Sequence, residues 1–521
     1  MPNYFTSPTF WFLFFSSLAA TCLLTPAVMV LARRIGAVDR GGYRKIYNGA
    51  MPLLGGLAVA GPFAGVCVAG LIGPTHMLEA LHGRMYDLLV LATGCAAIVA
   101  VGIVDDTRGM RARTKLFFQT LIALFVALSG NAVTTVGLPV VGTVHLGPVL
   151  GTFVAMLWIV GLVNAFNLVD GMDGLASGLA LIASVALGIL AALNGSTFVV
   201  LLCVALAGSL LGFLMYNFHP AKIFLGDTGS MFLGFALASI TLMDNYKTHA
   251  TVIFLPAVLA LGLPIFETML SIVRRYVRGK PLFSGDQEHT HHRLLKKGFT
   301  QRQVALILYS AAVLCLVAAV LFQLSTVRAH VSWMPLGLYV STVLGVAWMA
   351  GYLRLPEVRR QSRRRPHNQL LSAFSRYASM SLSSDSPFVT STELMRIARR
   401  ELGLRYLEAW FEEGPTQIVS SGRLRLSARA GAPAFVAAPD GFVTDEELRA
   451  LRVDTLKTLR VRSAGGYEII IRYQFYSEPD ELVAQDIGAA LANLFEQTRL
   501  TPPALSAAER GRPRYLEVFG Q

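Results

Sequence analysis

The chain has 521 residues, of which 54% are hydrophobic and 15% charged, and it carries a net charge of +13. Soluble domains contain about 25% charged residues, so this composition excludes an ordinary soluble protein for most of the chain. The Lys and Arg residues lie in loops between apolar segments, which indicates membrane topology and no nucleic-acid partner. The five cysteines lie inside apolar segments and form no CxxC pair, so neither a disulfide framework nor a zinc site is expected.

Apolar segments with the length that a bilayer requires recur through residues 1–353. The first, near residues 10–32, has no Lys or Arg before it and Arg33 and Arg34 after it, the reverse of a signal peptide. Further spans are expected near residues 52–72, 86–104, 115–136, 148–168, 178–193, 196–215, 229–243, 251–274, 304–324 and 332–353. Loops assigned to the inside carry most of the basic residues, and those assigned to the outside contain only Arg84, Lys247 and Arg328. We therefore predict an all-α polytopic membrane protein of about eleven transmembrane helices, with its N-terminus outside and its C-terminus in the cytoplasm.

The composition changes after residue 353. Residues 354–386 form a basic and then Ser-rich linker, whose arginines suit anionic lipid headgroups. Residues 387–500 predict a small soluble α/β domain, with helices at 391–402 and 481–500 and strands at 404–412, 456–463 and 467–475. This order is similar to that of GAF-type sensory domains, although no ligand motif is present, and a scaffold or dimerisation role is an equal alternative. Residues 501–521 predict a flexible tail.

The stretch from Asn164 to Gly174 is polar, although it follows an apolar run that would cross a bilayer. Its polar residues recur at every third position and are Asn164, Asn167, Asp170 and Asp173. Gly171 and Gly174 disfavour a continued helix, so we expect the helix to end near Asp170. Ionisable groups at the end of a membrane helix are costly and usually functional. A capped, water-exposed helix end is the alternative, but it explains only one Asp and one Gly.

A second acidic motif, Asp105-Asp106, ends the third span and precedes Lys115 and Gln119. Two adjacent carboxylates repel each other, so one of them is a candidate proton acceptor or metal ligand. An Asp pair that caps or terminates a helix is the alternative.

A third motif runs from Asn217 through Lys222 to Gly226 and Asp227, in a glycine-bracketed turn before a new span. Glycines let backbone N–H groups approach a phosphate, and an Asp in such a turn suits Mg²⁺, which takes few carboxylates and keeps water or phosphate oxygens. A Gly-Asp turn alone is common, and the neighbouring Asn217 and Lys222 make the prediction specific.

Basic and imidazole side chains gather in two loops that are expected on the same side of the membrane. The loop after the ninth span contains Arg274, Arg275, Lys280, Asp286, His289, His291, His292 and Arg293. Closed zinc sites usually include Cys, which this loop lacks, so a polyphosphate is the favoured ligand and a solvated charged loop is the alternative. The first inside loop contains Arg44, Lys45, Tyr47, Gly55 and Gly56. It suits a lipid phosphate, and ordinary positive-inside residues are an equal alternative.

Together these motifs resemble those of the polyprenyl-phosphate N-acetylhexosamine-1-phosphate transferases, the MraY/WecA/TagO family, over roughly residues 10–350. The matching residues are Asp105-Asp106 with Lys115 and Gln119, Asn164-Ala-Phe-Asn167-Leu-Val-Asp170-Gly-Met-Asp173-Gly, Gly226-Asp227-Thr-Gly-Ser and Asp286-x-x-His289-x-His291-His292. The His-x-His-His spacing is more similar to the WecA/TagO branch than to the consecutive histidines of the MraY branch.

The resemblance implies a reaction in which N-acetylhexosamine-1-phosphate, N-acetylglucosamine by analogy, passes from a UDP-sugar to undecaprenyl phosphate. The products are an undecaprenyl-diphosphate sugar and UMP. It implies an active site on the cytoplasmic face of a bacterial inner membrane, Mg²⁺ as cofactor with Mn²⁺ as a substitute, and the first membrane step of a cell-surface polysaccharide such as O-antigen or teichoic acid. The expected partners are the UDP-sugar, undecaprenyl phosphate, the lipid bilayer and, in a homodimer, a second copy of the chain.

The resemblance also implies residue roles. The implied catalytic residues are Asp105, Asp106, Asp170 and His291, and Asp105 matches the carboxylate proposed to deprotonate the lipid phosphate. Asp227 and Asp170 match the metal-binding positions. The implied substrate-binding residues are Arg44, Lys45, Lys115, Asn164, Asn167, Asp173, Asn217, Lys222, Arg275, His289, His292 and Arg293.

Two positions depart from the family pattern. Tyr47 stands where the family often has His, and Glu267, in Pro264-Ile-Phe-Glu267, stands where it often has Asp. Three other functions are alternatives: phospho-MurNAc-pentapeptide transfer, ion-coupled transport and a membrane-anchored sensor. A transporter would place its charges near span midpoints within inverted repeats, and a sensor would leave the polar motifs unexplained.

Overall fold

The computed structural model describes residues 7–39, 51–72, 80–138, 142–244, 254–278, 289–327 and 333–352, and six strands further along the chain. The chain divides into two compact units, one of Met1–Arg274 with Phe283–Val358 and the other of Arg275–Leu282 with Arg359–Gln521. The boundary after Val358 falls inside the linker predicted for residues 354–386.

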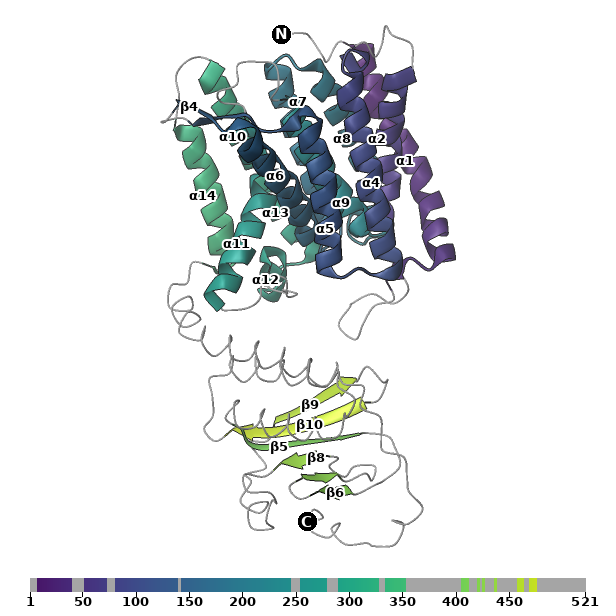
Figure 1. The fold of residues 1–521 in the computed structure, drawn as a ribbon, viewed down its shortest axis with the longest axis vertical. Coiled ribbons are helices and arrows are strands. Elements are labelled where there is room, and N and C mark those ends of the chain that lie inside the picture. Colours follow the sequence, from purple (N-terminus) through teal and green to yellow (C-terminus); the bar gives the residue numbers. More distant parts are fainter. Residues whose placement is uncertain are drawn as a thin grey trace. The chain divides into compact units, whose positions relative to one another are not determined.

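The first unit is a bundle of α-helices (Figure 1). Its helices are α1 (Pro8–Ile35), α2 (Gly55–Ile72), α4 (Met85–Arg108), α5 (Ala112–Val126), α6 (Gly147–Val169), α7 (Leu175–Leu193), α8 (Thr197–Asn217), α9 (Gly226–Asp244), α10 (Phe254–Ala260), α11 (Gly262–Arg278), α12 (Thr290–Lys296), α13 (Gln301–Val327) and α14 (Met334–Met349). Two short hairpins accompany them, β1 (Val38–Asp39) with β2 (Met51–Pro52) and β3 (Thr135–Leu138) with β4 (Gly142–His145).

Seven helical stretches in the described part of the chain are long and apolar enough to cross a membrane. They are Pro8–Ile35, Met85–Arg108, Ala112–Asn131, Gly147–Val169, Leu175–Leu193, Thr197–Asn217 and Gln301–Ser325. Each coincides with a predicted span, and the prediction of a helical, multi-pass membrane protein is confirmed. The total of eleven spans and their orientation stay predictions.

The span predicted near residues 251–274 consists of two helices, α10 and α11, which meet at Leu261. The physical reason is Pro264, which has no N–H to donate to the Ala260 carbonyl four residues earlier. The prediction of one uninterrupted helix was wrong at this point, and the break separates an apolar segment from the helix that carries Glu267 and Arg274.

Helix α9 occupies the interior of the bundle, where it contacts α2, α4, α6, α7 and α8. Every residue from Thr228 to Met243 is buried, as expected for a helix that is apolar on all sides. Glycines permit the close approach at its first turn, because a Cβ atom added to Gly56 would lie 2.2 Å from the backbone nitrogen of Gly229. The packing therefore fixes the N-terminus of α9, which carries Asp227.

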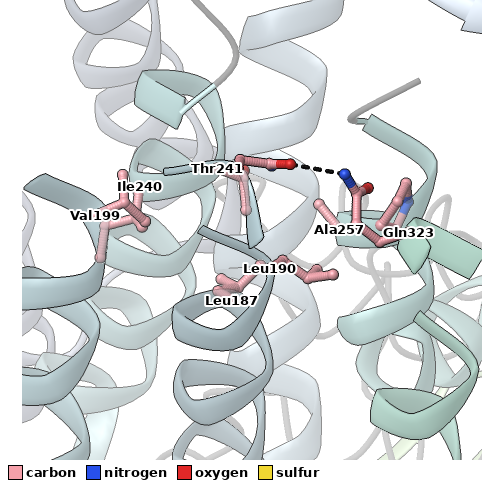
Figure 2. A pocket seen from close by; sticks show the side chains of 9 residues that line it. Leu187, Leu190, Val199, Ile240, Thr241, Ala257 and Gln323 are labelled. Carbon is pink, nitrogen blue, oxygen red and sulfur yellow. Dashed lines mark hydrogen bonds between the residues drawn. The ribbon is translucent and has the colours of Figure 1, made fainter. Parts of the chain in front are cut away.

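A small cavity of about 20 Å³ lies between α7, α8, α9, α10 and α13 (Figure 2). Gln323 Nε2 donates a hydrogen bond to Asn194 Oδ1 at 2.7 Å on its wall. Thr241, another lining residue, lies near the C-terminal end of α9, whereas Asp227 lies in its first turn. The cavity is therefore at the opposite end of α9 from the acidic motifs, and its volume is close to that of one water molecule.

The second unit contains a six-stranded antiparallel sheet with strand order β6-β7-β8-β5-β10-β9. Its strands are β5 (Leu404–Phe411), β6 (Val419–Ser421), β7 (Leu424–Leu426), β8 (Phe435–Ala437), β9 (Lys457–Arg462) and β10 (Glu468–Phe475). The three predicted strands coincide with β5, β9 and β10. The predicted helices at 391–402 and 481–500 lie outside the described residues, and the GAF-like assignment stays a prediction.

Candidate functional site

The candidate site lies where the end of α4, the start of α5, the end of α6 and the start of α9 meet at one end of the bundle (Figure 1). The Asp106 side chain at the end of α4 binds the first turn of α9. Its Oδ1 accepts the Asp227 N–H at 2.8 Å, and its Oδ2 accepts the Thr228 N–H at 3.0 Å and the Thr228 hydroxyl at 2.6 Å. Asp106 therefore caps a helix N-terminus from another helix, and it fixes the backbone of Asp227.

Gly226 makes this cap sterically feasible. Its φ of +74° lies in the left-handed region, and a Cβ atom added to it would lie 2.6 Å from Asp106 Oδ2. Any other residue would displace the carboxylate as well as strain the backbone.

Lys115 joins the two acidic motifs. Its Nζ lies 2.6 Å from Asp105 Oδ2 and 2.6 Å from Asp227 Oδ1. Asp105 Oδ1 also accepts the Met110 N–H at 2.7 Å, which ties the carboxylate to the short turn between α4 and α5. One ammonium group therefore bridges carboxylates that are more than a hundred residues apart in the chain.

Asn167, near the end of α6, completes the cluster. Its Nδ2 donates to Asp227 Oδ1 and, at 3.0 Å, to Ser230 Oγ. Asn164 lies one turn earlier on α6 and has other partners, because its Nδ2 donates to Gln119 Oε1 at 2.9 Å and to the Val160 carbonyl at 2.8 Å. The structure thus brings Asn167 to the carboxylates, whereas the Asn164 side chain links α6 to α5.

Asp170 follows directly after α6 and is the C-cap of that helix. Burial and the nearby carboxylates of Asp227, Asp106 and Asp173 raise the pKa of Asp170 well above its ordinary value. The local electrostatics therefore disfavour a second negative charge beside Asp227 unless a cation is bound.

This arrangement fits Mg²⁺ held by Asp227 and Asp170. Within the described ranges, no group of three or more His, Cys, Asp or Glu side chains is arranged to hold a metal ion. Mg²⁺ does not require such a group, since it binds through one or two carboxylates together with substrate phosphates and water. Burial contributes most to the raised pKa of Asp170, and a divalent cation would neutralise the repulsion that the nearby carboxylates add.

Asp173 and Asn217 connect the turn after α6 with the turn after α8. Asp173 Oδ2 contacts His219 Nδ1 at 2.8 Å and accepts the Ala221 N–H at 3.1 Å. Asn217 accepts the Ser177 hydroxyl at 2.6 Å and donates to the Ile223 carbonyl at 3.0 Å. These contacts order the turn after Asp170 and the backbone just before Asp227.

Lys222 is exposed on the turn after α8, and its backbone N–H donates to the Tyr216 carbonyl at 2.8 Å. Arg275 follows Arg274 on α11. Arg44 and Lys45, which were expected to bind the lipid phosphate, lie outside the described residues, as do Lys280 and Asp286.

The three histidines gather at the start of α12. The rings of His291 and His292 lie 4.3 Å apart between centroids, and those of His289 and His291 lie 5.7 Å apart and nearly parallel. A Cβ atom added to Gly171 would lie 2.5 Å from His291 Nε2, so this imidazole rests on the turn that follows Asp170. Burial, with the neighbouring imidazoles, lowers the pKa of His291 well below its usual range.

Sequence reasoning did not assign roles to Thr228, Ser230 and Gly171. Thr228 and Ser230 belong to the quoted Gly-Asp-Thr-Gly-Ser motif, so their hydroxyl groups beside Asp227 were available as a signal. From the sequence, Gly171 indicated only a turn. Its closeness to His291 could not be predicted, because the two residues are 120 positions apart in the chain.

The fold and the site define a polytopic membrane protein with a carboxylate-rich polar site at one end of its bundle. Residues 88–245 match the model of glycosyl transferase family 4. The chain is 34% identical over 315 residues to a probable undecaprenyl-phosphate N-acetylglucosaminyl 1-phosphate transferase of Bacillus subtilis, covering 60% of this chain and 85% of the relative.

Two further relatives agree with this match. A decaprenyl-phosphate N-acetylglucosaminephosphotransferase of Mycobacterium tuberculosis is 37% identical over 314 residues, covering 56% of this chain and 76% of the relative. An undecaprenyl-phosphate alpha-N-acetylglucosaminyl 1-phosphate transferase of Yersinia pestis is 31% identical over 340 residues, covering 62% and 87%. The chain therefore belongs to the family of polyprenyl-phosphate N-acetylglucosamine-1-phosphate transferases. This confirms the family resemblance that the motifs indicated.

Proposed function

We propose that the protein transfers N-acetylglucosamine-1-phosphate from UDP-N-acetylglucosamine to undecaprenyl phosphate, and that this is the first membrane step in the synthesis of a cell-surface polysaccharide. The observation that carries the proposal is the Lys115 ammonium between Asp105 and Asp227, with Asn167 on the same Asp227 oxygen. Phosphoryl transfer depends mainly on positioning and on neutralising negative charge, which a fixed lysine, amide and carboxylate set supplies. The names of the relatives support the sugar and the lipid acceptor.

In the proposed reaction an oxygen of the lipid phosphate attacks the phosphorus that bears the sugar. A new phosphorus–oxygen bond forms, and the bond from that phosphorus to the oxygen of the uridine phosphate breaks, so that UMP leaves with the bond's electron pair. Lys115 stabilises the negative charge that accumulates on the transferred group. Asn167 donates to the same Asp227 oxygen that Lys115 contacts, and it so helps to hold this carboxylate.

Asp105 is the proposed proton acceptor for the lipid phosphate. In the structure its Oδ2 contacts Lys115 and its Oδ1 accepts the Met110 N–H, so both oxygens are engaged. Each carboxylate oxygen has two lone pairs, so Oδ2 can accept a proton beside the Lys115 contact. The loss of charge on Asp105 would then leave the Lys115 ammonium to the incoming phosphates.

We also propose that the enzyme requires Mg²⁺, with Mn²⁺ as a substitute, held by Asp227 and Asp170. When bound, the metal would neutralise the diphosphate and polarise its phosphoryl oxygens. The crowded carboxylates around Asp170 support this assignment.

The site is proposed to face the cytoplasm across a bacterial inner membrane. Arg33 and Arg34 end α1, and Arg108, Arg111 and Arg113 flank the turn between α4 and α5, which follows the helix end that carries Asp105. Basic residues concentrate on the cytoplasmic side of membrane proteins. Their position next to the acidic site supports a cytoplasmic nucleotide sugar as donor.

The decisive experiment measures UMP release by the purified full-length protein with undecaprenyl phosphate and Mg²⁺. The donors compared are UDP-N-acetylglucosamine, UDP-N-acetylgalactosamine and UDP-MurNAc-pentapeptide. We expect turnover with the first donor only when both lipid and metal are present. Turnover only with the pentapeptide donor would assign the alternative reaction, and no UMP from any donor would refute the transferase proposal and favour a transport assay.

Single substitutions test the residue roles. Asp105→Asn and Asp227→Asn are each expected to abolish turnover while the protein still inserts and purifies as the parent does. Near-normal activity in both variants would refute the assignment of the site.

A further inference from the structure

The short helix α12 carries His291 and His292 but cannot hold its own position. With seven residues it is far below the length at which an isolated helix is stable in water. Its apolar anchor is Leu294, which is fully buried in a small cluster with Val304 and Val346. Polar contacts from α11 and from the end of α14 hold it as well.

The residue at the end of α14 that reaches α12 is Tyr352. The Gly351 N–H donates to the Trp348 carbonyl at 2.9 Å, and the Tyr352 N–H donates to the Ala347 carbonyl at 2.9 Å. Gly351 has a φ of +81°, which completes a Schellman turn. This turn folds the chain back and fixes Tyr352 against the helix end.

Two guanidinium groups then hold the Tyr352 side chain. The guanidinium carbon of Arg293, on α12, lies 4.3 Å from the ring centroid. Arg274, on α11, donates from Nη1 to the Tyr352 hydroxyl at 2.9 Å and is only 7% exposed. A cation–π contact contributes most to stability where water is excluded. Through these two contacts, one phenol side chain joins α11, α12 and the end of α14.

Glu267 adds a second link between α11 and α12. It lies seven residues before Arg274, about two helical turns, so both side chains lie on the same face of α11. Its Oε2 accepts the N–H of Thr290, the first residue of α12, at 3.3 Å. Lys297, just after α12, donates to the Met349 carbonyl at 2.5 Å. These contacts hold both ends of α12.

We propose that Tyr352 is a positioning residue for the transfer reaction, because it clamps α12 so that His291 rests against Gly171 beside Asp170. The inference rests on the proposed function, since it concerns turnover at that site. Loosening the clamp moves His291 Nε2 away from the turn after Asp170. Interactions made mainly in the transition state suffer more from such a displacement than substrate binding does.

The test compares Tyr352→Ala, Tyr352→Phe and the matched control Trp348→Leu in the full-length protein. Trp348 lies four residues earlier at the same helix end, and its side chain is 72% exposed. We expect Tyr352→Ala to lower kcat roughly 10- to 100-fold while KM for donor and lipid stays within about threefold. Tyr352→Phe keeps the ring for Arg293 and loses the bond to Arg274, so it should fall between Tyr352→Ala and the parent. Trp348→Leu should match the parent.

A second measurement follows the imidazole directly. His291 is 2% exposed, so diethyl pyrocarbonate should modify it slowly in the parent and faster in Tyr352→Ala, as measured on its peptide by mass spectrometry. An unchanged kcat in Tyr352→Ala, or a rise in KM with kcat retained, would overturn the proposal. If that variant fails to fold, Tyr352→Phe decides, and an unchanged kcat there overturns it. A parent protein that releases no UMP would instead refute the proposed function.

Discussion

Replacement of Asp106 should reveal whether this carboxylate reacts or holds Asp227 in place. It accepts hydrogen bonds from the N–H groups of Asp227 and Thr228 and from the Thr228 hydroxyl. Asp106→Ala removes both acceptor oxygens and with them all three hydrogen bonds, and it leaves two backbone donors at the start of α9 without this partner. We expect both the stability of the fold and turnover to fall.

The size of the effect follows from these three bonds. Hydrogen bonds to charged groups contribute about 1.5–3 kcal/mol each, and an N-cap contributes about 1 kcal/mol. Bonds that share one carboxylate are not additive, and repulsion between Asp106 and Asp227 opposes them. We therefore expect Asp106→Ala to lower the free energy of unfolding by roughly 2–4 kcal/mol. Asp106→Asn should cost roughly 1–2 kcal/mol, because its amide keeps one acceptor oxygen but turns an NH₂ group towards the Thr228 donors.

The assay is equilibrium unfolding in mild detergent, followed by tryptophan fluorescence, with turnover measured on the same samples. Thr228→Val is the matched partner variant, because it removes the 2.6 Å bond to Asp106 and keeps the side-chain shape. The double variant Asp106→Asn with Thr228→Val should destabilise less than the sum of the single changes. If Asp106 were purely catalytic, its removal would relieve repulsion with the other carboxylates, and Asp106→Ala would be as stable as the parent or more stable. Loss of turnover with unchanged or increased stability in Asp106→Ala would therefore refute the capping argument.

Three further outcomes are expected. Gly171→Ala should lower kcat at least about tenfold, because its Cβ would meet His291 Nε2, whereas Gly161→Ala, which has no neighbouring atom within 4 Å, should leave kcat unchanged. His291 has a lowered pKa in the fold, so its contribution to stability is present above the unfolded pKa of about 6.5 and is lost as pH falls. When the free energy of unfolding is measured from pH 8 to 5, His291→Gln should therefore lose less stability towards low pH than the parent. An identical pH dependence in the two proteins would contradict the burial argument. Deletion beyond residue 370 should leave UMP release largely intact, and an inactive but correctly inserted truncation would show that the C-terminal part takes part in catalysis.

Hydrophobic length and charge placement were sufficient to predict most of the long helices and the grouping of the acidic motifs. An apolar run of bilayer length has few alternatives to a helix, so the spans near 86–104 and 148–168 correspond to α4 and α6. Polar motifs at span ends on one side must then lie near one another. This reasoning correctly brought together Asp105, Lys115 and Asp227.

The partner of each polar side chain was not predictable, because it depends on how the helices pack. Helix capping was the alternative role of the Asp105-Asp106 pair. The structure shows that Asp106 does cap a helix, but this helix is α9 and not α4, which carries Asp106. The distance of more than 120 residues between Asp106 and Thr228 leaves no local pattern to detect. The same applies to Tyr352, whose role depends on Arg274 and Arg293 meeting from two other helices.

The spacing of three in the Asn164–Asp173 motif explains why one motif serves several partners. Three residues rotate a helix by about 300°, so successive side chains step around the axis and do not form one stripe. Asn164 accordingly meets Gln119, Asn167 meets Asp227 and Ser230, and Asp173 contacts His219 after the helix has ended. A four-residue spacing would rotate each step by only about 40°, in the opposite sense, and would spread the side chains less. The motif therefore holds α5, α9 and the turn after α8 in one arrangement around Asp170.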